Sequence, residues 1–140
     1  DKPARGMVMN LHKLTGLLIL LLMLCRLFWA LMNPKPELPV GTKIWERMLS
    51  RAVHFTLYVL ILAMPVAGWV MSSASGHAPF IGSFKMKLPI AESDEVSHVA
   101  MNTHNFLAIV IIILVSLHVL AALFHFFIKK DNVLQRMMPD

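Results

Sequence analysis

The sequence is short of cysteine and of charge, and each shortage excludes a class of protein. Its single cysteine, Cys25, lies in the middle of an apolar run, so no internal disulfide can form and we interpret Cys25 as a small packing residue. The motif Cys-x-x-Cys-His is absent, which excludes covalent attachment of a haem. Only 15% of the 140 residues are charged and 57% are hydrophobic, a composition that is not typical of a soluble domain.

Three apolar runs, residues 11–32, 53–71 and 106–128, are long enough to cross a membrane as helices. About 20 apolar residues are needed to span roughly 30 Å of hydrocarbon. Residues 17–25 are apolar on every face of a helix, whereas a helix at the surface of a soluble protein has a polar face. The sequence therefore predicts an all-α membrane protein with one compact membrane domain over residues 1–140.

The formal net charge of +5 is distributed over connections and tails, which indicates membrane topology and not a nucleic-acid-binding surface. The connection 33–51 and the tail 129–140 are rich in Lys and Arg, whereas the loop 72–103 is not. The positive-inside rule places the connection and the tail in the cytoplasm and the loop 72–103 outside. Within that loop, residues 90–103 are expected to form an amphipathic helix at the membrane surface.

The same orientation places residues 1–10 outside, in a chain that does not begin with Met. Either a cleaved signal peptide or a further membrane helix is expected before Asp1, and we favour the helix. The fold class is then a transmembrane four-helix bundle of which three helices are present here.

Five histidines lie in or at the ends of the apolar runs, and ionisable residues at such places indicate function. They are His12, His54, His104, His118 and His125. Fourteen residues separate His104 from His118, which places both on nearly the same helix face about 21 Å apart. Because these histidines lie at different depths and the acidic residues are confined to loops, a compact zinc site is disfavoured. Pairs of histidines on facing helices fit the axial ligands of haem iron.

Depth in the membrane assigns the pairs. His12 and His104 both begin an apolar run on the outer side, so we expect them to ligate an outer haem. His118 needs a partner near the inner side, which is either His54 or a histidine on the expected preceding helix. Arg26 follows His12 by fourteen residues on nearly the same face, where it contacts either haem propionates or lipid headgroups.

Four segments together resemble the bacterial cytochrome b561 family, and the resemblance covers nearly the whole chain. They are Asn-Leu-His-Lys-Leu-Thr-Gly at 10–16, His-Phe-Thr-Leu-Tyr at 54–58 leading to Met-Pro-Val-Ala-Gly at 64–68, His-Val-Leu-Ala-Ala-Leu-Phe-His at 118–125, and Lys-Asp-Asn-Val-Leu-Gln-Arg-Met-Met-Pro at 130–139. The resemblance implies a four-helix cytochrome b of the bacterial inner membrane, with two haem b groups, that exchanges electrons with ubiquinone. Superoxide is an electron donor associated with this family.

The resemblance also implies roles for individual residues. His12 and His104 would ligate the periplasmic haem, and His118 the cytoplasmic haem, with its partner on the helix that is absent from this chain. His54 and His125 match positions at the inner side where quinone binds, and Lys43 is a weaker candidate for the same site.

The expected function is electron transfer from a periplasmic donor, with superoxide as a candidate, through two haems to ubiquinone. The outer surface would then be cationic, and five residues are candidates for supplying that charge: Lys2, Arg5, Lys13, Lys85 and Lys87. Two alternatives stay open at this point. One is a membrane-anchor cytochrome b subunit of a larger dehydrogenase or hydrogenase, and the other is a histidine-lined membrane protein without haem.

Overall fold

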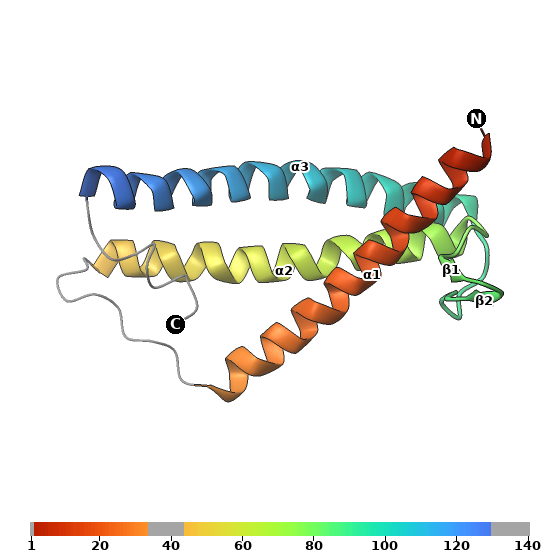
Figure 1. Cartoon of the computed structure of the whole chain (residues 1–140), viewed down its shortest axis with the longest axis horizontal. Coiled ribbons are helices and arrows are strands. Elements are labelled where there is room, and N and C mark those ends of the chain that lie inside the picture. The colour runs from red at the N-terminus through yellow and green to blue at the C-terminus, as the bar shows by residue number, and fades with distance from the viewer. Residues whose placement is uncertain (1, 34–43, 130–140) are drawn as a thin grey trace.

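The computed structural model describes residues 2–33 and 44–129 and consists of three long helices with a small hairpin at one end (Figure 1). The helices are α1 (Lys2–Met32), α2 (Ile44–Ala74) and α3 (Asp94–Phe124), and a π-helical turn, η1 (His125–Lys129), continues α3. Strands β1 (Phe80–Ile81) and β2 (Phe84–Lys85) pair antiparallel in the connection between α2 and α3. Helices α2 and α3 lie side by side, while α1 crosses them obliquely and diverges towards its C-terminal end.

All three helices are long and apolar enough to cross a membrane, over Ala4–Met32, Ile44–Ala74 and Asp94–Lys129, which confirms the predicted fold class. Large apolar side chains remain exposed along each of them, including Leu21 at 58%, Phe55 at 71% and Ile112 at 65%. Apolar surface of this extent needs lipid or protein around it. Within each helix the backbone bonds to itself, which satisfies its polar groups in hydrocarbon.

The last helix begins earlier than the sequence predicted, and most of the helix expected over 90–103 is continuous with it. Helix α3 runs without a break from Asp94, so residues 94–103 are its first turns. The side chain of Ser93 caps this start by accepting a hydrogen bond from the Val96 amide, and Asp94 and Glu95 place negative charge in the first turn. Both features stabilise a helix N-terminus.

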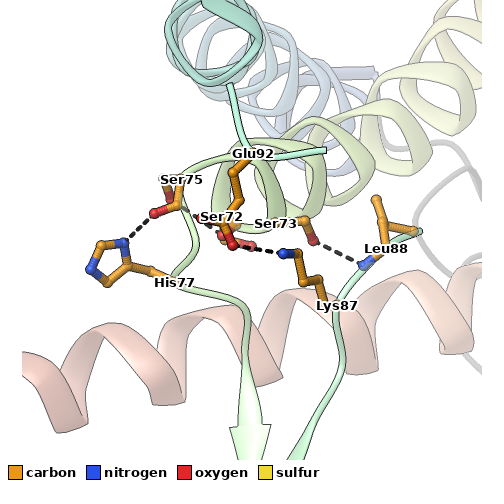
Figure 2. A network of polar contacts seen from close by, with 7 residues as sticks. All are labelled: Ser72, Ser73, Ser75, His77, Lys87, Leu88 and Glu92. Atoms are coloured by element: carbon orange, nitrogen blue, oxygen red, sulfur yellow. Dashed lines mark hydrogen bonds and ion pairs between the residues drawn. The ribbon is translucent and has the colours of Figure 1, made fainter. Parts of the chain in front are cut away.

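The connection between α2 and α3, residues 75–93, folds back over the end of the bundle, and we call it the outer cap. Polar contacts anchor it to α2 (Figure 2). The buried hydroxyl of Ser73 accepts a hydrogen bond from the Leu88 amide at 3.1 Å, and the indole N–H of Trp69 donates to the Met86 carbonyl at 2.7 Å. Because these bonds join the second half of the connection to the helix from which it starts, the outer cap has a defined position above the bundle.

A turn at Gly76 and an ion pair between Lys87 and Glu92 stabilise the outer cap. Gly76 has a φ of +75°, and a Cβ there would lie 3.2 Å from the Glu92 carboxylate. That carboxylate accepts a 2.7 Å hydrogen bond from Lys87, and this bond and the charge of Lys87 lower the pKa of Glu92 (Figure 2). The ion pair therefore contributes at neutral pH, and its contribution is lost as the pH falls through the lowered pKa of Glu92.

The side-chain amide of Asn10 in α1 makes two hydrogen bonds to the hairpin. Its Nδ2 donates to the Phe80 carbonyl at 2.9 Å, and its Oδ1 accepts from the Phe80 amide at 3.0 Å. Three residues further along α1, the Lys13 ammonium donates to the His77 carbonyl. Helix α1 is thus attached to the outer cap as well as to α2.

Replacing Asn10 by alanine should loosen the hairpin without unfolding the helices. Each lost hydrogen bond contributes about 0.5–1.5 kcal/mol net, so we expect the protection of the Phe80 amide against hydrogen exchange to fall by about tenfold or more. Hydrogen exchange of a peptide covering the hairpin measures this. Asn102→Ala, at an exposed position of α3, is the matched control and should leave the hairpin unchanged.

Candidate functional site

A cavity of about 320 Å³ lies beneath the outer cap where the three helices meet. His12 of α1 and His104 of α3 both line it, and their ring centroids are 6.3 Å apart with the ring planes at 86°. Lys13 and Pro79 lie at the same cavity, the latter from the outer cap. The structure therefore brings together the two histidines that the sequence analysis paired because both were expected near the outer side of the membrane.

His104 is held in one orientation by α2. Its Nδ1 lies 3.0 Å from the carbonyl oxygen of Met64, and because a carbonyl only accepts, Nδ1 carries the proton. In the neutral imidazole, the lone pair of the other ring nitrogen, Nε2, is then available to a metal. Gly68 allows the ring to lie this close, since a Cβ at Gly68 would be 3.1 Å from the His104 Cε1 and Nδ1 atoms.

The donor set fits an axially ligated metal. A metal held between two facing imidazoles, with metal–nitrogen distances of about 2 Å, separates the ring centres by about 6 Å. His12 and His104 have this separation, at 6.3 Å. Over residues 2–33 and 44–129, no three His, Cys, Asp or Glu side chains converge as a tetrahedral zinc site requires. The residues present thus fit a metal whose remaining ligands come from a planar macrocycle.

A second pair of histidines lies at greater depth. The rings of His54 on α2 and His118 on α3 are 5.3 Å apart, and His54 Nδ1 donates to the Ser50 carbonyl at 2.7 Å. A neighbouring cavity of about 250 Å³ is lined by His54, Arg26 and Tyr58. The two candidate roles of His54, inner haem ligand and quinone contact, both suit this position beside His118.

The other two residues predicted for the inner quinone site are His125 and Lys43. His125 begins η1, two turns beyond His118, and its ring packs edge-on against Phe124 at 6.2 Å. Lys43 lies outside the described residues. An ion pair of 2.8 Å between Lys129 and Glu46 joins the end of η1 to the start of α2. Among the described residues, those that line the cavity of His54 and Arg26 do not include His125.

The predicted cations of the outer side are distributed unevenly. Lys13 lines the outer cavity, whereas Arg5 and Lys85 are exposed away from it and Lys87 is paired with Glu92. The side chain of Lys2 lies outside the described part of the chain. Lys13 is therefore the cation best placed to act on a charged group that enters this cavity.

Sequence reasoning missed three residues of these sites: Met64, Gly68 and Tyr58. Met64 acts through its backbone carbonyl, so its residue type gives no signal. A glycine inside an apolar helical run indicates a close approach of another group, and this signal was available for Gly68. Tyr58 is the only tyrosine of the chain and lies in the motif that begins at His54.

Comparison with known proteins places the whole chain in one family. The family model described as prokaryotic cytochrome b561 matches residues 1–140. Cytochrome b561 homolog 2 of Escherichia coli is 31% identical over 130 residues, which are 92% of this chain and 69% of that relative. Cytochrome b561 homolog 1 of the same organism is 30% identical over 91% of this chain and 73% of its own length. A protein of Yersinia pestis named probable superoxide oxidase CybB is 30% identical over 92% of this chain and 73% of its own length.

These matches confirm the resemblance on which the sequence analysis relied, and with it the membrane location. The family consists of four-helix membrane bundles that carry haem b and transfer electrons, and the three long helices seen here agree with that architecture. The chain belongs to the prokaryotic cytochrome b561 family.

Proposed function

We propose that this protein transfers electrons from superoxide at the outer side of the membrane through two haems to ubiquinone at the inner side. The observation that carries the proposal is the arrangement of histidines in two layers. His12 and His104 lie beneath the outer cap, and His118 lies beside His54 about 21 Å further along α3. Bound haem supplies one-electron chemistry at each layer.

At the outer layer, His12 and His104 would hold the haem iron, and the Met64 carbonyl would keep Nε2 of His104 available for it. A fixed positive charge next to this site accelerates the capture of an anion such as superoxide. Lys13 supplies that charge from the same cavity. The relative named probable superoxide oxidase supports this choice of donor.

At the inner layer, His118 would hold haem iron together with a second histidine, and His54 would contact the quinone. The overall reaction balances when two superoxide ions each lose one electron and become O₂, while one ubiquinone gains two electrons and two protons. Histidine is a suitable proton donor near neutral pH. Arg26 and Tyr58 line the cavity next to His54 and provide hydrogen-bond donors for a quinone oxygen or a propionate.

Rapid mixing of the full-length protein with superoxide, in the absence of other oxidants, tests the proposal. Haem absorbance should shift to the reduced form, and added ubiquinone should reoxidise it with formation of ubiquinol. Reduction by superoxide without reoxidation by ubiquinone would contradict the inner half of the proposal. Reduction by ubiquinol but not by superoxide would contradict the outer half.

Removing the charge of Lys13 should slow the reaction with superoxide. For Lys13→Gln we expect a rate about tenfold lower at low ionic strength, with the difference narrowing as salt screens the field. Lys13 also bonds to the outer cap, so Asn10→Ala serves as a control that loosens the cap without changing charge. An equal loss of rate in both variants would show that Lys13 acts through the cap.

Adding one methyl group at Gly68 should disturb the outer haem. A Cβ at 3.1 Å from the His104 ring forces the imidazole to shift, and outer contacts of this kind change metal affinity by about 10-fold to 100-fold. Gly68→Ala should therefore lower the affinity of the outer site for haem and change its electron paramagnetic resonance signal. Gly6→Ala, with no atom within 4 Å of the new Cβ, should change neither.

A further inference from the structure

The hairpin of the outer cap carries exposed apolar side chains in a part of the chain that the proposed function does not use. Phe80 is 45% exposed, Ile81 63% and Phe84 68%. Ile81 and Phe84 are cross-strand partners, so they share one face of the ribbon, whereas Phe80 pairs with Lys85 on the other. A two-stranded hairpin is at best marginally stable alone, and exposed apolar side chains such as these indicate a surface that contacts lipid or protein.

The height of the hairpin along α1 indicates what surrounds these side chains. The apolar run of α1 begins at Leu11, and Asn10, which bonds to both backbone groups of Phe80, lies directly before it. Strand β1 is thus held at the outer boundary of the apolar run of α1. Met7, one turn before Asn10 on the same face of α1, is also apolar and 78% exposed.

We propose that the β1–β2 hairpin lies in the interface of the outer leaflet, with Ile81 and Phe84 among the upper parts of the lipid chains and Lys85 at the phosphate level. Aromatic and apolar side chains next to a cation are the chemistry that an interfacial segment requires. A lysine side chain reaches from the apolar boundary to a headgroup phosphate. Gly82, with a φ of +59°, forms the tight turn that lets the ribbon end there.

The hydrogen bonds that hold the hairpin link its contact with lipid to helices α1 and α2. Asn10 joins it to α1, and Trp69 joins its base to α2 through the Met86 carbonyl. A hairpin seated in lipid therefore holds α1 against the outer cap at the height of the outer cavity. This contact does not depend on haem binding or on the identity of the electron donor.

Single cysteines in the full-length protein test the proposal after removal of the exposed native thiol by Cys25→Ala. Phe84→Cys and Ile81→Cys report on the hairpin, and Glu95→Cys, exposed at the start of α3, is the control on the same side of the membrane. The proteins are placed in vesicles of phosphatidylethanolamine and phosphatidylglycerol, and an unchanged haem spectrum shows that each variant is folded. Two probes are then applied, a charged maleimide in water and a nitroxide carried near the headgroup end of a lipid chain.

Residues 81 and 84 should react with the maleimide at least about tenfold more slowly than residue 95, because a thiol in apolar surroundings is poorly ionised. A bimane fluorophore on the same cysteines should be quenched by the lipid nitroxide. Reaction as fast as at residue 95 would overturn the proposal. So would protection without quenching by lipid, which means that protein covers the hairpin, or protection that disappears on dilution of the protein in lipid, which means that a second copy does.

Discussion

Replacing His104 by alanine is expected to leave the protein with one haem instead of two and to abolish its reduction by superoxide. The substitution removes one of two neighbouring imidazoles whose centres are 6.3 Å apart, and it is the one that α2 holds in place through the Met64 carbonyl. His12 is more exposed and belongs to the oblique helix α1, so we expect that it would not keep the haem alone. Haem content per chain and the reduced absorbance spectrum measure the loss.

The matched control is His98→Ala, at an exposed position on the same helix six residues nearer the outer end. It removes an imidazole from the outer side of α3 without touching the cavity, so both haems and the reaction with superoxide should persist. If His104→Ala retained both haems and normal reduction, the assignment of the outer ligands would be wrong.

The second large effect is expected to distinguish the role of His118 from that of His54. We expect His118→Ala to lose the inner haem and with it all transfer to ubiquinone. His54→Ala should keep both haems and slow quinone reduction by about 100-fold, the usual contribution of a positioned acid or base. Haem content, followed by the rate of ubiquinol formation, distinguishes the two variants.

These two variants are needed because the rings of His54 and His118 lie only 5.3 Å apart, so their positions alone do not assign the iron ligand. Loss of the inner haem in His54→Ala would make His54 the partner of His118 in binding iron. The quinone contact would then have to be sought elsewhere, and Arg26 and Tyr58, which line the adjacent cavity, would be the first residues to substitute.

The existence of the three helices was predictable from sequence, but their ends were not. Apolar runs mark the part of a helix that lies in hydrocarbon, and helices continue beyond it. Helix α3 begins at Asp94, twelve residues before the predicted run at 106, because Ser93 caps it and the polar residues between are compatible with helix. Hydropathy gives no signal at a cap of this kind.

For the site, the spacing of histidines along one helix could be predicted from the sequence, whereas contacts between helices could not. Counting residues placed His104 and His118 at two depths, and depth alone paired His104 with His12, whose ring the structure places next to it. Their role as iron ligands stays a prediction. The contacts of Met64 and Gly68 with His104 join positions about 40 residues apart, and they depend on how α2 and α3 pack.

A redox titration of the purified full-length protein, followed by absorbance and combined with haem analysis, tests the central claim most directly. Two layers of histidines predict two haem b groups per chain that titrate as separate one-electron centres, with the component lost in His104→Ala being the one that superoxide reduces first. A colourless protein, or one with a single haem unaffected by His104→Ala, would contradict the account.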